Sequence, residues 1–246
     1  MTETPAPPAA PSFRSDMTVE LVKHSASDTD VLWAARVSTA GEQSLDELNK
    51  DPERSKGLIN FLMRDRHGSP FEHNSLTFFI SAPLFVFREF HRHRVGWSYN
   101  EESGRYRRLQ PVFYVPDADR KLVQQGRPGK YEFVPGTEEQ HQLTSRSMAD
   151  VYRKAYETYE EMLAAGVARE VARAVLPVGL YSSMYATCNA RSLMHFLGLR
   201  TQHEQAKVPS FPQREIEMVG ELMEEQWAKL MPLTHAAFNA NGRVAP

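Results

Sequence analysis

The chain has 246 residues, of which 41% are apolar and 24% are charged, and its mean hydropathy is −0.51; these values are typical of a soluble protein with one or two domains. The net charge of −2 argues against a general nucleic-acid binder, and no apolar run reaches the roughly 18 residues that a membrane span needs. The single cysteine excludes an intrachain disulfide and a multi-cysteine zinc site, and it indicates a reducing, cytoplasmic setting.

The N-terminal third of the chain begins with a segment that is rich in Pro and Ala. We expect residues 1–16 to be a disordered lead-in and residues 17–246 to form one domain. Residues 17–24 alternate between apolar and polar side chains, which predicts a strand. An apolar stripe at helical spacing predicts helices over residues 28–36, capped by the aspartate, and over residues 52–66, ended by a glycine.

The middle of the chain changes its pattern several times. Ser69-Pro70-Phe71-Glu72 has the spacing of a capping box and predicts a helix start. Residues 75–81 predict an apolar strand, and residues 81–93 predict an amphipathic helix. Residues 95–109 have no sustained period and are expected to be a loop, and residues 120–136 are expected to be a surface connection.

Helical patterns dominate the C-terminal half. One strand is predicted at residues 180–187, followed by Asn189 as the cap of the next helix. The predicted helices cover residues 145–165, 168–176, 190–201 and 211–230. Strands and helices interleave with too few strands for a doubly wound sheet. The sequence therefore predicts a single-domain α+β fold with an antiparallel or mixed sheet against which helices pack.

Positive charge is concentrated in one segment of this mildly acidic chain. Residues 88–108 contain six arginines and two histidines against three glutamates; the cations are Arg88, His91, Arg92, His93, Arg94, Arg105, Arg107 and Arg108. Guanidinium groups bind phosphate through paired, charge-assisted hydrogen bonds. The segment is thus a candidate site for a small anionic ligand such as a nucleotide phosphate, and a solvated charged face is the alternative.

The order of residues in this segment forms a recognisable motif. Arg92-His93-Arg94 is followed, after a short gap, by Ser98-Tyr-Asn-Glu-Glu-Ser-Gly-Arg-Tyr106. This order resembles the signature of flavin-dependent thymidylate synthases. Further blocks of the chain resemble the same family in the same order; they are residues 34–38, 67–73, 169–177 and 189–200. The signature departs from the family's usual form by one extra residue within Val95-Gly96-Trp97.

The resemblance implies a set of site residues. FAD would be held by Ser69, Arg92, His93, Arg94, Glu101, Asn189, Arg191 and His195. The substrate dUMP would be held by Glu89, Phe90, His91, Arg92, Glu101, Glu102, Ser103, Gly104, Arg105, Arg173 and Arg200. His67 and Arg200 would be catalytic, with Arg200 stabilising the negative charge that develops on the uracil ring. No metal site is expected.

The resemblance also implies the reaction and its partners. Reduced FAD, recharged by NADPH, would supply a hydride, and 5,10-methylenetetrahydrofolate would supply the one-carbon unit that converts dUMP to dTMP. No GxGxxG fingerprint occurs, so NADPH would bind at the flavin and not in a separate Rossmann domain. The family implies a homotetramer whose sites are shared between subunits. No nucleic-acid or membrane partner is expected.

Simpler readings remain for several features. Glu72 is explained by the capping box alone, Arg173 fits a helix-terminal cation, and Cys188 fits a small buried residue. Phe85, Phe87 and Phe90 fit the core. Two other functions stay open: a non-catalytic protein that binds a nucleotide or RNA with the cationic loop, and a flavoprotein that acts on another anionic substrate.

Overall fold

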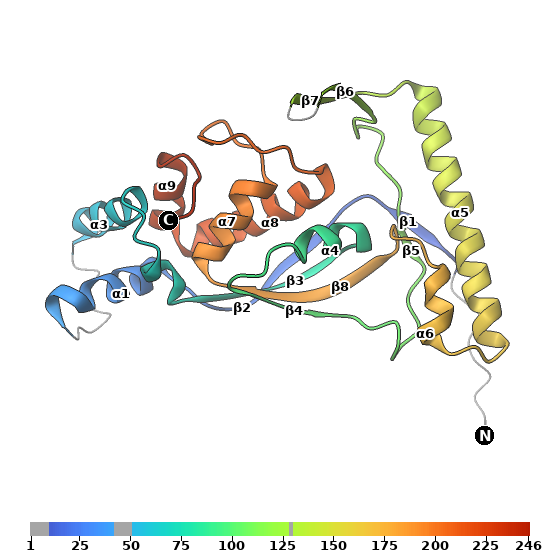
Figure 1. The fold of residues 1–246 in the computed structure, drawn as a ribbon, viewed down its shortest axis with the longest axis horizontal. Coiled ribbons are helices and arrows are strands. Elements are labelled where there is room, and N and C mark those ends of the chain that lie inside the picture. The colour runs from blue at the N-terminus through green and yellow to red at the C-terminus, as the bar shows by residue number, and fades with distance from the viewer. Residues whose placement is uncertain (1–9, 42–50, 128–129) are drawn as a thin grey trace. The chain divides into compact units, whose positions relative to one another are not determined.

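A computed structural model describes residues 10–41, 51–127 and 130–246 of the chain (Figure 1). These residues form two compact units, each assembled from separate stretches of sequence. The first unit takes the described parts of Met1–Asp16, Ser81–Arg88 and Glu101–Ser183. The second unit takes the described parts of Met17–Ile80, Glu89–Asn100 and Met184–Pro246.

Most residues of a four-stranded sheet belong to the second unit, and its residues 81–83, 101 and 181–183 belong to the first. Its strand order is β2-β3-β8-β4, with β2 at Thr18–Ser25, β3 at Ser75–Pro83, β8 at Tyr181–Cys188 and β4 at Trp97–Glu101. Alternate residues of β3 are buried, which is the period-2 pattern of a strand with one face on a core. The hydroxyl groups of Thr77 and Thr187 lie 2.9 Å apart and link two of these strands. Figure 1 shows α7 and α8 lying over one side of this sheet.

The helices of the second unit differ in how their free N–H groups are capped. They are α1 (Asp28–Ala40), α3 (Pro52–Arg64), α7 (Ala190–Arg200), α8 (Arg214–Leu230) and α9 (Pro232–Ala240). Asp51 and Asn189 accept hydrogen bonds from the helices that follow them. The sequence predicted Asp28 as the cap of α1, but the N-cap residue is Ser27. The Asp28 carboxylate instead accepts hydrogen bonds from the main-chain N–H groups of Leu233 and Thr234 at the start of α9.

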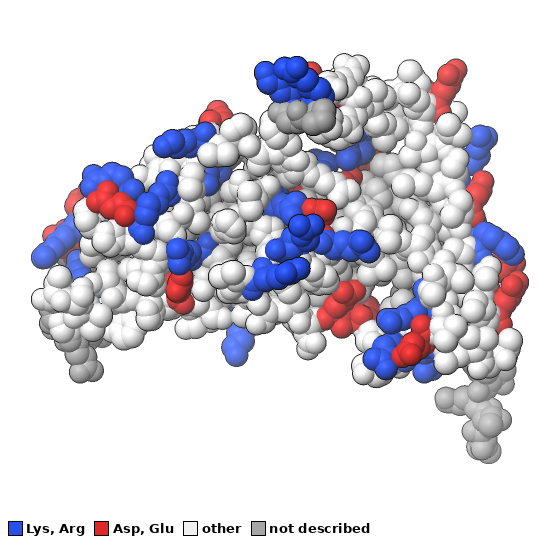
Figure 2. Space-filling view, viewed as in Figure 1, with Lys and Arg blue, Asp and Glu red and all other residues white. Residues whose placement is uncertain are grey.

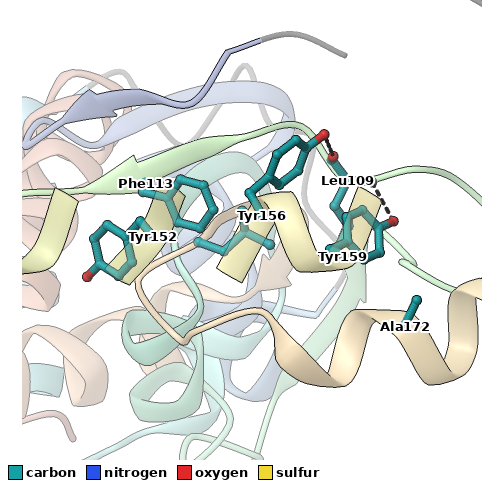
Figure 3. Close-up of a cluster of buried hydrophobic side chains, with 7 residues drawn as sticks. Leu109, Phe113, Tyr152, Tyr156, Tyr159 and Ala172 are labelled. Carbon is teal, nitrogen blue, oxygen red and sulfur yellow. Dashed lines mark hydrogen bonds between the residues drawn. The ribbon is translucent and has the colours of Figure 1, made fainter. Parts of the chain in front are cut away.

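The first unit is built around the long helix α5 (Glu138–Ala164). It also contains a parallel strand pair, formed by β1 (Ser12–Arg14) and β5 (Val112–Tyr114). The unit is completed by a hairpin and by the short helix α6 (Arg169–Ala172), which continues into the 3₁₀ turn Arg173–Val175. Figure 3 shows its core, in which Tyr152, Tyr156 and Tyr159 of α5 face Leu109 and Phe113. The Tyr156 hydroxyl donates to the Leu109 carbonyl at 3.2 Å, and the Leu109 N–H donates to the Tyr159 hydroxyl at 3.4 Å. The buried hydroxyl groups of Tyr156 and Tyr159 therefore have partners.

Most predicted elements are confirmed, and their differences have local causes. The strands expected at 17–24, 75–81 and 180–187 are β2, β3 and β8, in that order. The helices expected at 28–36, 52–66 and 145–165 are α1, α3 and α5. The helices expected at 168–176, 190–201 and 211–230 are α6 with its 3₁₀ turn, α7 and α8. Helix α5 begins seven residues before its predicted start. The cause is a capping box between Thr137 and Gln140, in which each side chain accepts the other's main-chain N–H.

Three predictions in the middle of the chain are wrong. Ser69–Glu72 is a single 3₁₀ turn without a side-chain cap, so the capping box predicted there does not form. The helix expected from residue 81 is α4, limited to Leu84–Phe90, because β3 continues through Pro83. The loop expected at 95–109 contains strand β4, which joins the edge of the sheet.

Further differences concern the periphery. The surface connection expected at 120–136 contains the antiparallel hairpin β6 (Val123–Arg127) and β7 (Lys130–Val134). The lead-in expected at 1–16 contains β1, and residues 1–9 of that lead-in lie outside the described residues. Helix α9 had no assignment from the sequence. Within residues 10–41, 51–127 and 130–246, no helix is both long and apolar enough to cross a membrane.

Candidate active site

Helix α7 carries four of the predicted site residues of the second unit. Asn189 caps it by accepting the Ser192 N–H at 2.8 Å, and the Ala190 N–H donates to the Asn74 side chain at 2.7 Å. Two of the N–H groups at this helix start are therefore already used. The anion-binding role expected for this terminus must consequently rest on side chains such as Arg191 and His195, and not on these two amides.

The last residue of α7, Arg200, is held by two predicted site residues. Its Nη1 donates to a carboxylate oxygen of Glu89 at 2.6 Å, and its Nη2 lies 3.4 Å from the Glu89 carbonyl. Its Nε donates to Nε2 of His93 at 3.0 Å. The Arg200 side chain is only 19% exposed. Hydrogen bonds at both ends of the guanidinium fix its plane, and the structure thus brings together Glu89, His93 and Arg200.

His93 can accept this hydrogen bond because it is neutral. Burial, together with the positive charge of Arg200 and the nearby His195, lowers the pKa of His93 to about 4. At neutral pH the imidazole therefore presents an unprotonated Nε2 to Arg200 and carries its proton on Nδ1. A protonated His93 would place a second cation against Arg200.

Aromatic rings enclose the Glu89–His93–Arg200 cluster on one side. The Phe90 ring is fully buried and stacks on Phe196 with ring centroids 4.7 Å apart. The Tyr99 hydroxyl lies 2.9 Å from the His93 carbonyl and 3.1 Å from the Phe90 carbonyl, and burial raises the pKa of that phenol. Trp97 stacks on Tyr99 with centroids 5.7 Å apart. The side chain of Phe90 therefore belongs to the hydrophobic core. Only the main chain of Phe90 could make the substrate contact that the resemblance implied.

The turn that follows Arg92-His93-Arg94 is pressed against the start of α7. Gly96 has φ of +70°, a conformation that L side chains rarely adopt. A Cβ at this position would lie 2.1 Å from the Ser192 hydroxyl, which itself donates to the Val95 carbonyl at 3.0 Å. Glycine is therefore required here for both its torsion and its size. The extra residue of the signature falls in this turn.

Arg191, expected to bind the flavin, has protein partners in this structure. Its Nη1 donates to the Glu72 carboxylate at 2.5 Å, and its Nε donates to the main-chain oxygen of Pro246 at 2.6 Å. Gly68 lies beneath the guanidinium, since a Cβ there would be 2.6 Å from the Arg191 Cζ. Glu72 is thus an ion-pair partner of Arg191, and the interpretation of Glu72 as a capping residue is wrong. Ser69, in the same turn, is exposed.

The remaining predicted residues of the second unit are exposed. His67 follows α3 and its ring lies 5.6 Å from that of Phe61. His91, Arg92, Arg94 and His195 have exposed side chains. Neither Arg92 nor Arg94 forms an ion pair with another residue in the described ranges. Figure 2 shows Lys and Arg side chains gathered over the helix that Figure 1 labels α4, with acidic side chains among them.

In the first unit, strand β8 binds the two glutamates of the signature. The Ser182 hydroxyl donates to the Glu101 carboxylate at 2.9 Å, and the Ser183 hydroxyl donates to the Glu102 carboxylate at 3.3 Å. Arg107 forms an ion pair with Glu102 at 3.0 Å, and this glutamate is 17% exposed. The two carboxylates are therefore fixed in place, and each keeps further acceptor capacity.

The rest of the signature makes a compact turn. The main-chain N–H of Arg105 donates to the Ser103 hydroxyl at 3.3 Å. Gly104 is buried, and a Cβ on it would lie 2.9 Å from Leu109 and 3.2 Å from the Arg173 side chain. Arg105 is ion-paired with Glu170 at 2.5 Å. Ser103, Gly104, Arg105 and Arg173, all predicted to bind substrate, are thus neighbours in this unit.

Sequence reasoning missed the partners that orient these residues. The strand pattern of residues 180–187 does not reveal the roles of Ser182 and Ser183, although a pair of small hydroxyl side chains inside an apolar strand is a signal for nearby acceptors. Glu170 lies within the predicted block at residues 169–177, but nothing in the sequence pointed to its ion pair with Arg105. A shallow hollow of about 830 Å³ beside α5 is lined by Tyr156 and charged residues of that helix, and it contains no predicted site residue.

The residues present fit an anionic nucleotide cofactor and substrate. The exposed guanidinium groups of Arg92, Arg94 and Arg173 have no carboxylate partner in the part of the chain that the structure describes. A phosphate can therefore bind them without first breaking an ion pair. Binding at Arg191, in contrast, would compete with Glu72.

Several known proteins are similar to this chain in sequence and in fold. The family described as "Thymidylate synthase complementing protein" matches residues 20–233. A flavin-dependent thymidylate synthase of Streptomyces avermitilis is 84% identical over 246 residues, which is 100% of both chains. Two crystal structures of a UMP/dUMP methylase, PolB from Streptomyces cacaoi, are also similar. The one bound with 5-Br UMP has 56% identity, covers 96% of this chain and 100% of that chain, and gives a TM-score of 0.87. The one bound with 5-Br dUMP has 58% identity, covers 95% and 99%, and gives 0.89.

Proposed function

This chain belongs to the thymidylate synthase complementing protein family, and we propose that it methylates dUMP reductively to dTMP as a flavin-dependent thymidylate synthase. FAD is the cofactor, and in its reduced form it supplies a hydride. We propose 5,10-methylenetetrahydrofolate as the one-carbon donor and NADPH as the reductant. The observation that carries the proposal is Arg200, fixed by Glu89 and His93 within a motif segment rich in arginine.

Exposed arginines bind the phosphates in this proposal. Arg92 and Arg94 would bind the flavin and nucleotide phosphates. Arg173 would bind the substrate phosphate beside Ser103, together with Arg105, which would exchange its ion pair with Glu170 for the phosphate. Supporting this, Gly104 lets the main chain approach Arg173 closely, and Ser103 already accepts one hydrogen bond within its turn. Bidentate guanidinium–phosphate contacts contribute about 1.5–3 kcal/mol each, which is enough to select a monophosphate over a nucleoside.

Arg200 is the residue to which we assign activation of the pyrimidine. Its charge would stabilise electron density that gathers on the uracil carbonyl during the reaction. Such stabilisation depends on a guanidinium whose orientation is fixed before substrate arrives. Glu89 and neutral His93 provide that orientation, with N–O and N–N distances of 2.6 and 3.0 Å. We assign His67 a place beside the flavin, and its exposed position leaves its ring accessible.

The first experiment is an anaerobic visible spectrum of the purified protein with NADPH, with and without dUMP, followed by a dTMP assay with the folate. A yellow protein whose flavin bleaches, and faster with dUMP, supports the proposal. Arg200→Ala should then lower turnover by about 100-fold while flavin content is retained. A colourless protein that takes up no FAD and binds RNA with a steep salt dependence would favour the binding-protein alternative. Flavin reduction that ignores dUMP would favour another flavoenzyme.

We also propose a homotetramer in the cytoplasm with sites shared between subunits. The predicted residues fall into two sets, one around Arg200 and one around Ser103, which can meet across a subunit boundary. Mixing two inactive variants, Arg200→Ala and Arg173→Ala, tests this. Restored activity in the mixture is expected for shared sites, because some sites then combine two intact halves. If the mixture stays inactive although the subunits exchange, the sharing is refuted. Light scattering gives the oligomeric state.

A second candidate substrate is UMP. The observation that favours it is the similarity, at 56–58% identity and TM-scores of 0.87–0.89, to a methylase of UMP and dUMP. The 84% identity to a thymidylate synthase favours dUMP as the main substrate. Competition between the two nucleotides at equal concentration, with the ratio of methylated products as readout, gives the preference directly.

A further inference from the structure

The residues that follow α9 bind along helix α7, which bears Asn189, Arg191, His195 and Arg200. The Arg191 Nε donates to the Pro246 main-chain oxygen at 2.6 Å near the start of α7. The carbonyl of Arg243 lies so close to Gly198 that a Cβ on that glycine would be 2.8 Å from it. Residues 242–246, which we call the C-terminal strap, therefore contact α7 near both of its ends.

Arg243 anchors the strap to the protein interior. Its side chain is 1% exposed and forms a two-pronged ion pair with Glu224 of α8, at 2.6 and 2.7 Å. Its remaining donors reach Asn239 at 2.6 Å and the hydroxyl of Thr201 at 2.9 Å. His235 also lies 2.8 Å from the Glu224 carboxylate. A buried guanidinium with this many partners is rigid, because each lost hydrogen bond would leave a charged group unsatisfied.

Thr201 is the residue at which α7 ends, directly after Arg200. Its main chain is extended, with φ of −129° and ψ of 147°, so the chain leaves the helix at this point. Its hydroxyl donates to the Leu197 carbonyl at 2.8 Å and accepts from Arg243. Its carbonyl accepts from the Ser210 hydroxyl at 2.5 Å. The exit of the chain from α7 is thereby fixed from several directions.

We propose that Arg243 is a positioning residue for Arg200, and that it acts through the hydroxyl of Thr201. Glu224 holds Arg243, Arg243 holds Thr201, and Thr201 sets the last turn of α7 from which the Arg200 side chain extends to Glu89 and His93. The inference rests on the catalytic role proposed for Arg200. All of these residues belong to the second unit.

A purely structural role for this network is the competing explanation. Under that explanation, activity falls only as far as the protein unfolds. Under the positioning role, activity follows the Thr201 hydroxyl even when the fold is intact. The two side-chain features of Thr201 can be separated, because its methyl group packs on Gly220 while its hydroxyl binds Arg243.

The test compares Thr201→Val, which keeps the methyl and loses the hydroxyl, with Thr201→Ser, which does the reverse. We expect Thr201→Val to lower kcat about 10-fold and to change KM for dUMP less than about 2-fold, because Arg200 acts on charge that develops during the reaction. We expect Thr201→Ser to keep kcat within about 2-fold of the wild type while its Tm falls by about 2–4 °C. Gln226→Ala is the control, since it removes hydrogen bonds between α8 and β2 without touching α7.

Arg243→Lys is a second variant that does not depend on the folding of Thr201→Val. Lysine keeps a charge beside Glu224 but lacks the forked donors that also reach Thr201, so the same fall in kcat is expected. Equal kcat in Thr201→Val and the wild type, or kcat that follows Tm across all four variants, would overturn the inference. If the wild type itself forms no dTMP, the proposed function fails instead, and the two failures are thus distinguishable.

Discussion

Replacing Gly96 with alanine tests the close packing of the signature turn on helix α7. The residue has φ of +70°, and the new Cβ would lie 2.1 Å from the Ser192 hydroxyl. The left-handed conformation costs about 1–2 kcal/mol for an L residue, and the reduced freedom of the unfolded chain offsets up to about 1 kcal/mol. Ser192 must also rotate away, which breaks its 3.0 Å hydrogen bond to Val95 and costs about 1 kcal/mol.

The expected loss is therefore about 2 kcal/mol, which corresponds to a fall in Tm of about 4–8 °C. Differential scanning calorimetry measures it. Gly166→Ala is the matched control, because Gly166 has φ of +85° but no atom within 4 Å of the position of a Cβ. Its expected loss is about 1 kcal/mol, from the torsion alone. Flavin content should fall only in Gly96→Ala, since the turn follows directly after Arg94.

A double-mutant cycle separates the clash from the torsion. Ser192→Ala removes the hydroxyl that obstructs the new methyl group, so Gly96→Ala should cost about 1 kcal/mol less in that background than in the wild type. If Gly96→Ala and Gly166→Ala are equally destabilising, or if the cycle is additive, the turn does not pack on α7 as described.

Three further predictions concern single groups. Burial opposes ionisation of Glu224, but hydrogen bonds from Arg243 and a histidine lower its pKa from 4.5 to about 2. The carboxylate therefore stabilises the fold fully above about pH 4.5. Its contribution to the free energy of unfolding, on the order of 3 kcal/mol, is lost as the pH falls towards 2. Denaturant unfolding between pH 6 and 3 should show this loss, and Glu224→Gln should flatten the curve. The Cys188 thiol is 3% exposed and burial raises its pKa, so a thiol reagent should label it only at the rate of unfolding, and rapid labelling of the folded protein would contradict its burial. Tyr156→Phe leaves the Leu109 carbonyl without its 3.2 Å partner and should cost about 1–2 kcal/mol in chemical denaturation, whereas an unchanged midpoint would show that water replaces it.

Local patterns were sufficient for the elements that the chain specifies by itself. The stripe of Leu58, Ile59, Leu62 and Met63 predicted α3, and all of these but the half-buried Leu58 are buried. Asn189 was predicted as the cap of α7 and accepts the Ser192 N–H. Such features depend on residues three or four apart, and their physical causes are visible in a short window.

Elements that depend on distant partners could not be predicted. Strand β4 is only five residues long, so the alternation of Trp97 and Tyr99 with polar residues is too brief to predict a strand, and β4 forms at the edge of the sheet beside β8. Strand β1 pairs with β5 about one hundred residues away, with Phe13 opposite Phe113. Such pairings are decided by long-range contacts that a local pattern does not contain.

The candidate site divides in the same way. The resemblance assigned ligand contacts to Glu89, His93 and Arg200, and the structure brings these side chains into contact with one another, although 111 residues separate Glu89 from Arg200. No pattern in the sequence pointed to Glu72 as the partner of Arg191 or to Arg243 behind Thr201. Both are single side chains on otherwise ordinary segments, and their contacts can be identified only from the three-dimensional structure.

The interleaving of the two units governs how the chain can fold and how it can be divided. Each unit combines stretches that are far apart in the sequence, and the chain passes between the units several times. Native contacts of high sequence separation must form before either core is complete, so folding requires the closure of long loops and is expected to be slow. A cut anywhere within residues 17–183 would divide both units. Proteolytic nicking within this range should therefore yield no autonomous domain.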